Sequence, residues 1–308
     1  MFRSQVAKAI AELREAAART AWTQWGAIFT APATRRQASA IVDPEALLLG
    51  SFALMEHERR LAGVVRLWAQ YQARLLSVQR AKNLVERFPT AIRDQLGQFA
   101  HTALTQGGDL RWRSIAQKSA KALAVREREK QASPVLEGAA SVMLRLRLGL
   151  GVGIKPDVIA YLMGLAGGRA TVQAIADATA YHARAVRRGL EELAAAGFVE
   201  PRPTAPVSYR VDSRRWAQLL RIDPEDPPVW RSWAAMYAFV AGVDEWGRSL
   251  PESDFVLASE ARDLLVMYGT RLEGAVRLPY LEGATGEGIL PLFLTALREC
   301  RDWVEGVV

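Results

Sequence analysis

The stretch 175-IADATAYHARAVRRGLEELAAAGFVE-200 decides how the rest of the chain is interpreted. Within it, Val186, Leu190 and Leu193 recur at the four- and three-residue intervals of one buried helix face. Gly197 follows them, and glycine is the residue that most often ends a helix. The spacing therefore predicts an amphipathic helix with one apolar side.

The outer side of this helix, which we expect over about 182–196, is rich in arginine. Arg184, Arg187 and Arg188 fall there because an α-helix turns by about 100° per residue. An arginine can donate two hydrogen bonds to a guanine edge, or it can hold a phosphate. On an ordinary surface helix it would instead pair with an acid, and Glu191 stands four residues after Arg187. The pattern alone leaves both interpretations open.

Two shorter helices are expected before this one. Pro156 begins the first, and Gly167 ends it. Thr171 is a suitable N-cap for the second, because its hydroxyl can accept a backbone N–H. The turn that follows contains no glycine, and His182 is a weaker cap than serine. We therefore expect a displaced turn in which Thr179 caps the third helix.

Two short strands are expected after the helices. Residues 198–199 read as the first strand, 201-PRPTAP-206 as a turn, and 208–211 as a returning strand with alternate residues on one face. The order is helix, helix, helix, strand, turn, strand. This is the order of a winged helix-turn-helix with a two-stranded wing.

The same residues carry a resemblance to a known family. The stretch 175–200, followed by SYRV at 208–211, resembles the DNA-binding domain of MarR-like and ArsR-like winged-helix transcriptional regulators. The matching positions are Ile175, Ala176, Val186, Gly197, Phe198 and Val199. The resemblance covers only the segment 155–216. It implies a homodimeric, sequence-specific regulator of transcription that binds double-stranded DNA, with repression as the expected mode.

In such a regulator the helix at 182–196 reads the major groove, and the wing at about 200–211 contacts the DNA backbone. The candidate DNA contacts are Thr171, Gln173, His182, Arg184, Arg187, Arg188, Arg202, Thr204 and Arg210. Contacts to phosphates would position the domain, and only contacts to base edges would give it sequence preference.

Charge divides the chain into three segments. Residues 1–154 carry a net charge of +11, residues 155–216 of +3 and residues 217–308 of −7, within a total of +7. We expect a mainly α fold with a basic helical domain, the central DNA-binding domain and an acidic helical domain for dimerisation or sensing. The basic segments are the ones that can face a polyanion.

The flanking segments show helical spacing throughout. Helices are expected over 4–20, 43–85 with a break near Glu58, 90–105, 114–125, 134–148, 228–246, 255–272 and 289–304. No apolar run reaches the ~18 residues of a membrane span, so no membrane partner is expected. Cys300 is the only cysteine, which excludes a disulfide within the chain and favours a cytoplasmic location.

Enzymatic motifs are weak. The segment 148-LGLGVGI-154 lacks the spacing of a phosphate-binding loop and suits a flexible joint. The segment 50-GSFALMEHE-58 places its two glutamates within a helical pattern, and zinc-type spacing of cysteine and histidine is missing. We expect neither catalysis nor a cofactor or metal. Two alternatives stay open: a winged-helix adaptor that binds protein instead of DNA, and an unknown effector in an aromatic pocket, although packing is the better explanation of the nine tryptophans.

Overall fold

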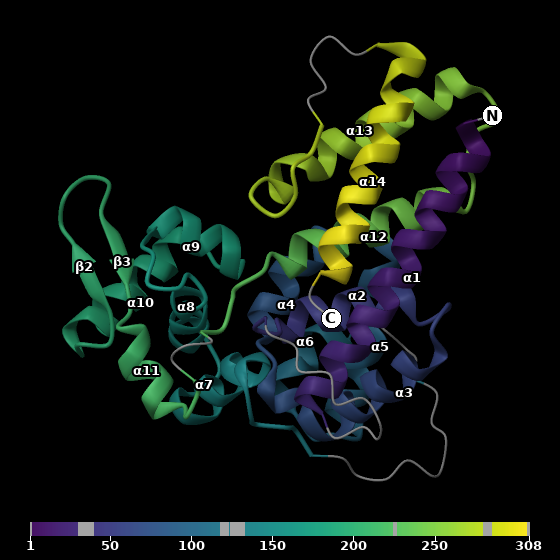
Figure 1. The fold of residues 1–308 in the computed structure, drawn as a ribbon. Coiled ribbons are helices and arrows are strands. Elements are labelled where there is room, and N and C mark those ends of the chain that lie inside the picture. Colours follow the sequence, from purple (N-terminus) through teal and green to yellow (C-terminus); the bar gives the residue numbers. More distant parts are fainter. Residues whose placement is uncertain are drawn as a thin grey trace.

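A computed structural model of the chain describes residues 2–29, 40–117, 123, 133–223, 227–279 and 285–306. Within these ranges the protein is mainly α-helical and contains one small three-stranded sheet (Figure 1). The predominance of helix confirms the fold class at this level. Most of the second half of the helix expected over 114–125 lies outside the described residues.

Helices from both ends of the chain form one group, which we call the body. They are α1 (Phe2–Ile28), α2 (Pro44–Leu54), α3 (Arg59–Leu67), α4 (Val78–Val85), α5 (Thr90–Thr105), α6 (Arg113–Ala116), α12 (Trp233–Gly247), α13 (Asp254–Leu272) and α14 (Ile289–Glu305). Short π or 3-10 segments at Trp68–Gln72, Ala73–Leu75 and Leu110–Trp112 connect some of them, and Gly286–Gly288 precedes α14. The first helix, α1, packs against the last, α14 (Figure 1).

The body has a single hydrophobic cluster, to which both chain ends contribute. Trp25 of α1, Phe52 of α2 and Phe293 of α14 are each at most 1% exposed within it. The segments 1–154 and 217–308 therefore share a core, which their opposite net charges did not predict. Net charge depends on the solvent-facing sides of the helices, whereas both segments contribute apolar residues from their buried sides to this one cluster.

The start and end of several helices differ from expectation. The predicted cap at Asp43 is confirmed, since its side chain accepts from the Ala46 amide, and the predicted break lies at Glu58, which caps α3. The helix expected over 134–148 is wrong in its first half: a 3-10 turn at Ala139–Ser141 leads into α7, because Gly138 has a φ of +72°. The first helix extends well beyond its predicted end.

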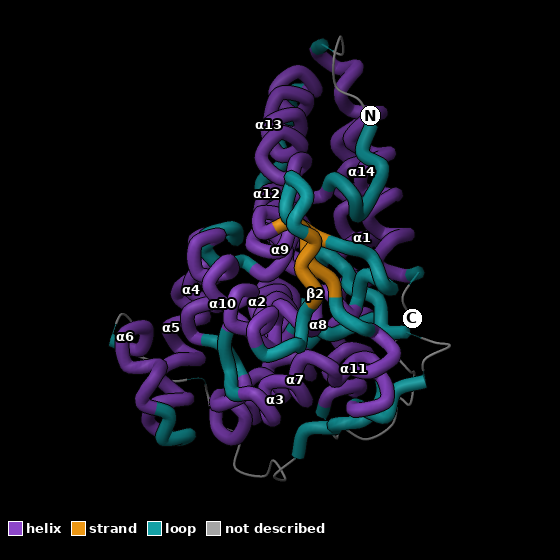
Figure 2. The backbone as a smooth tube through the Cα atoms, turned by 90° about the vertical axis from the view of Figure 1, so that its left-hand side faces the viewer, coloured by secondary structure: helices purple, strands orange, loops and turns teal. Residues whose placement is uncertain are grey.

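The remaining elements form a second group, which we call the sheet unit. They are α7 (Val142–Leu150), α8 (Ile154–Met163), β1 (Ala170–Thr171), α9 (Val172–Thr179), α10 (Ala183–Ala195), β2 (Glu200–Arg202), β3 (Ser208–Arg210) and α11 (Ser213–Leu219). Its hydrophobic cluster extends from Val142 to Ile222, beyond the expected limits of 155–216, and also takes in Ile41 from the segment before α2. Figure 2 shows the strands beside these helices.

The sheet has the strand order β1-β3-β2, with both pairs antiparallel. Tyr209 lies opposite Ala170 on one side and opposite Pro201 on the other. The expected two-stranded hairpin is therefore completed by a third strand, β1, which has only two residues and is too short to show an alternating pattern. The first hairpin strand begins at Glu200 instead of residue 198, and Phe198 is 39% exposed.

The three helices before the hairpin are present as expected, but α8 begins at Ile154, two residues before the predicted Pro156, and ends at Met163, before Gly167. The Thr171 hydroxyl accepts from the Ala174 amide, as expected of an N-cap. Val186, Leu190 and Leu193 of α10 are buried, and their opposite face is turned to solvent. The helical periodicity of this region was therefore sufficient to predict which side of α10 is exposed.

Candidate functional site

The turn between α9 and α10 sets the direction of the arginine-bearing helix. Ala180 adopts the left-handed conformation, with a φ of +56°, and His182 takes the N-cap position without a side-chain bond. Thr179 does not cap α10, so that prediction is wrong: its buried hydroxyl donates to the Ile175 carbonyl one turn back, at 2.6 Å. The expected displacement of the turn is therefore not observed, although the turn contains no glycine.

Two side chains of α4 hold this turn against the body. Arg80 Nε donates to the Thr179 carbonyl at 2.7 Å, and Asn83 Nδ2 donates to the Ala180 carbonyl at 2.8 Å. A left-handed alanine costs roughly 1–2 kcal/mol and persists where the surroundings fix it. Bonds to two successive carbonyls, together with burial of Ala180 in the body's hydrophobic cluster, supply that constraint.

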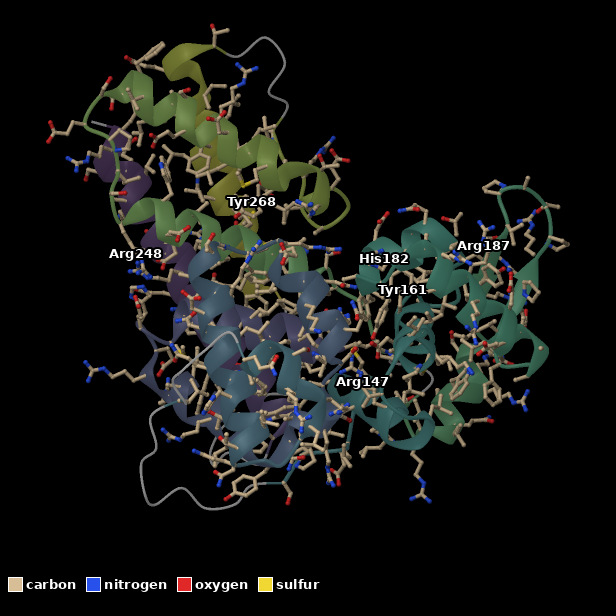
Figure 3. The ribbon with its side chains drawn as sticks, turned by 180° about the vertical axis from the view of Figure 1, so that it is seen from behind. Arg147, Tyr161, His182, Arg187, Arg248 and Tyr268 are labelled. Carbon is tan, nitrogen blue, oxygen red and sulfur yellow. The ribbon has the colours of Figure 1, made fainter. Side chains whose placement is uncertain are left out.

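Beneath the turn lies a buried network of ion pairs, which we call the ion-pair network. Its members are Asp43, Glu45, Arg80, Arg147 and Asp157, whose side chains are at most 2% exposed. Arg80 pairs with Asp43 at 2.5 Å and with Glu45 at 2.7 Å. Arg147 pairs with Glu45 and with Asp157, each at 2.7 Å. The network therefore joins the body to α7 and α8 of the sheet unit, and Figure 3 shows Arg147 where the two groups meet.

The network contains three carboxylates and two guanidinium groups. Burial acts to raise the pKa of Glu45, but the adjacent Arg147 and Arg80 outweigh it and lower that pKa. Burial raises the pKa of Asp157 in spite of its pairing with Arg147. The pKa values of Glu45 and Asp157 thus shift in opposite directions. This agrees with the charges of the network, because three carboxylates face two guanidinium groups and one added proton would make the network electrically neutral.

Tyr181 connects the turn to this network. Its hydroxyl donates to Asp157 Oδ2 at 2.8 Å, and the Ser77 hydroxyl lies 3.0 Å from the Tyr181 hydroxyl. Burial raises the pKa of Tyr181, so the hydroxyl remains a hydrogen-bond donor at neutral pH. The sequence predicted a packing role for the ring, and Tyr181 is indeed buried in the sheet unit's cluster. It did not indicate the partner of the hydroxyl.

Replacing Tyr181 by phenylalanine should lower the free energy of unfolding by about 1–3 kcal/mol, because an acceptor of the ion-pair network loses its buried donor. Tyr161→Phe is a matched control, since among the described residues its hydroxyl has no hydrogen-bond partner, and this change should be nearly neutral. Urea unfolding followed by tryptophan fluorescence measures both. Equal effects of the two substitutions would refute the role assigned to the Tyr181 hydroxyl.

The predicted arginine face of α10 is exposed. Arg184, Arg187 and Arg188 all lie at the surface, with the Arg188 side chain 83% exposed, and Figure 3 places Arg187 on the outer part of the sheet unit. The expected pair between Arg187 and Glu191 is replaced by one between Arg188 and Glu192, at 3.0 Å. Neither Arg184 nor Arg187 forms an ion pair with any described residue.

Glu192 also contacts a second cation, Lys155 of α8, at 2.7 Å. The two ion pairs lower the pKa of Glu192, first through its hydrogen bonds with Lys155 and Arg188. Exposed ion pairs of this kind contribute little to the free energy of folding, so Arg188 can leave Glu192 for another partner with little loss of stability.

The other candidate residues lie around α10 in two places. Thr171 caps α9, and Gln173 donates to Asp177 at 2.9 Å on the exposed side of that helix. On the hairpin, Arg210 donates to Glu200 at 2.7 Å, whereas Arg202 and Thr204 are exposed. The fold therefore brings the candidates onto one unit, with three arginines on α10 and the others at its two sides.

A cleft of about 670 Å³ separates α10 from α4. Its walls include Asn83 and Arg111 from the body, and Lys155, His182 and Arg188 from the sheet unit. One side of α10, from His182 to Glu192, thus borders this cleft, whereas Arg184 and Arg187 do not line it. Figure 3 shows His182 close to the body and Arg187 farther from it.

Sequence reasoning missed the ion-pair network completely. A signal was present, because Arg147 interrupts the apolar run VMLRLRLGL of α7, where a charged residue can be buried only if it is paired. The sequence could not identify its partners, since Glu45 lies 102 residues away from Arg147.

Within the described ranges, no group of three or more His, Cys, Asp or Glu residues is arranged to hold a metal ion, and none of the helices there combines the length and the hydropathy that a membrane span requires. No protein-family model matches the chain, and no curated protein or solved structure matches it either.

Proposed function

We propose that the sheet unit is a winged helix and that the protein binds double-stranded DNA as a sequence-specific regulator of transcription, with repression as the expected mode. In this proposal α10 enters the major groove and the β2–β3 hairpin contacts the backbone. The observation that carries it is the exposed arginine face of α10, whose opposite face is buried in the cluster of the sheet unit.

The arrangement of elements supports this proposal. The order α8, β1, α9, α10, β2, β3, with the strand order β1-β3-β2, is the one expected of a winged helix. The hairpin lies directly after α10 in the chain, so Arg202 can reach the backbone next to the groove that Arg184 and Arg187 would enter.

The fixed position of α10 also supports it. A helix that reads base edges gains affinity when it is already held in its binding geometry. Arg80 and Asn83 hold the turn before α10, and Tyr181 ties that turn to the ion-pair network. The body would thereby present the first turn of α10 in a single orientation.

A protein-binding adaptor is the second candidate. Glu192 pairs with Lys155 and with Arg188, so this side of α10 carries both negative and positive charge. Such a surface suits a protein partner that has both acidic and basic side chains. The two candidates differ in their dependence on salt, since only binding to DNA releases the counterions condensed on phosphates.

The test of DNA binding begins with selection of duplexes from a random pool by the purified full-length chain. The apparent affinity for the selected site should then fall with salt. The four positive charges that Arg184, Arg187, Arg188 and Arg202 would bring to the DNA predict a slope of log K against log [salt] of about −3 to −4. Fluorescence anisotropy titrations over a series of KCl concentrations would measure it. Failure to enrich any duplex would refute the proposal and leave the adaptor.

A further inference from the structure

The cleft of about 670 Å³ between α10 and α4 has the size of a small-molecule site. Such sites measure roughly 300–1,000 Å³ and combine apolar walls with a few polar groups. The apolar part of the wall is formed by Val78, Leu150, Val152 and Ile154. Leu150 is 41% exposed, so its side chain is available to a ligand. The glycine-rich segment 148–154 thus contributes to the wall of a cleft.

The charged part of the wall is mainly cationic. Lys155 and Arg188 lie on the side of the sheet unit, and Arg111 lies on the side of the body. Among the described residues that line the cleft, Glu192 is the only acidic one. Arg111 is held in place, because its Nε and Nη2 atoms donate to the two carboxylate oxygens of Asp109. The cleft therefore offers cations to an anion from both of its sides.

The two ion pairs of Glu192 indicate which anion fits. Lys155 Nζ lies 2.7 Å from one Glu192 oxygen, and Arg188 Nε lies 3.0 Å from the other. A free carboxylate would gain little by replacing Glu192, because Glu192 has the same charge and is tethered at the site. A phosphate monoester carries roughly 1.5 to 2 negative charges at pH 7 and three acceptor oxygens. It can therefore attract Lys155 and Arg188 more strongly than Glu192 does.

Three helices begin at this cleft, and their ends add to its positive potential. The lining includes Ser77 at the start of α4, Gly153 at the start of α8 and His182 at the start of α10. The first N–H groups of a helix have no partner within the helix and give that end a partial positive charge. Neither Gly153 nor His182 caps its helix through a side chain, so no side-chain cap competes with an anion at these two ends.

We infer that the cleft binds a small phosphate monoester with an apolar body. The phosphate takes the place of the Glu192 carboxylate between Lys155 and Arg188, and the apolar body packs on the wall that includes Leu150. The DNA backbone suits the cleft less well, because each of its phosphodiesters carries a single charge. The inference does not require DNA binding, although Arg188 would serve in both.

The experiment titrates the full-length chain with 1-naphthyl phosphate by isothermal titration calorimetry. Two further probes each share part of its chemistry: 1-naphthoate keeps the apolar body with a single carboxylate charge, and inorganic phosphate keeps the charge without the body. Naphthyl phosphate should bind with a micromolar dissociation constant, about tenfold or more below that of either comparison probe.

Substitutions in the cleft should change this affinity in opposite directions. Lys155→Met and Arg188→Met should each weaken binding of naphthyl phosphate about tenfold or more, because a charge-assisted hydrogen bond is lost. Glu192→Gln should tighten it, because the competing carboxylate is removed. The exposed pair of Arg93 with Glu86 lies outside the cleft, so Arg93→Met and Glu86→Gln are controls with the same changes of charge. Both controls should bind the probe like wild type.

A wild type that does not bind naphthyl phosphate would overturn the inference. Equal affinities for naphthyl phosphate and 1-naphthoate would do the same, as would equal effects in the cleft variants and their controls. Thermal unfolding of each variant checks that it is folded, as expected because all the substituted side chains are exposed. Misfolding cannot produce the expected pattern, since Glu192→Gln should bind more tightly than wild type.

Discussion

Replacing Arg147 by methionine should lower the free energy of unfolding by about 3–5 kcal/mol, the largest effect expected of any single substitution in this protein. Arg147 is inaccessible to solvent and donates to both oxygens of Glu45, to both oxygens of Asp157 and to the Leu75 carbonyl. Methionine fills a similar volume but leaves two buried carboxylates without their main partner. Since domains are stable by only ~5–15 kcal/mol, the loss should be visible as a large fall in the urea midpoint.

Arg93→Met is the control for this substitution. Arg93 pairs with Glu86 at 2.6 Å, but the two side chains are 48% and 62% exposed, so losing the pair should change the stability by less than about 1 kcal/mol. The two variants remove the same charge and differ in burial. If Arg147→Met cost no more than Arg93→Met, the ion-pair network would not be what joins the sheet unit to the body.

The second large effect concerns DNA. The double variant Arg184→Ala with Arg188→Ala should weaken binding to a selected site by more than about 1 kcal/mol, and by up to several kcal/mol if both side chains contact base edges. Both residues are exposed on α10, so the free energy of unfolding should hardly change. Anisotropy titrations at fixed salt would measure the affinity, and urea unfolding would verify the fold.

The control is the double variant Arg93→Ala with Arg298→Ala, which removes two exposed arginines from the body. It lowers the net charge of the protein by the same amount, so it reports the contribution of the overall field to binding. A double variant on α10 that bound DNA as tightly as this control would show that α10 is not the reading helix.

The buried sides of the helices and some of their N-caps could be predicted from the sequence, because both depend on the spacing and type of neighbouring residues. The spacing of Val186, Leu190 and Leu193 identified the buried side of α10, and Thr171 and Asp43 were recognised as N-caps from their residue type and position. The exposure of the arginines on α10 followed from the same periodicity. Each of these features depends on residues within a few positions of one another.

The β1 strand and the turn before α10 could not be predicted in this way. Ala170 and Thr171 form a strand only because Tyr209 and Ser208 lie beside them. Ala180 holds its left-handed conformation where a glycine was expected, because Asn83 bonds to its carbonyl from a different helix. In both cases a distant segment overrides the local preference.

The sequence by itself determined that the chain is mainly helical, that Thr171 caps α9, and which side of α10 is polar. Only the tertiary structure decided that both chain ends share one core and that Arg147 meets Glu45 and Asp157. The physical reason is the sequence distance over which each feature is determined. Helix periodicity and capping depend on residues within a turn or two of one another. The burial of a charge depends on partners about a hundred residues away in the chain.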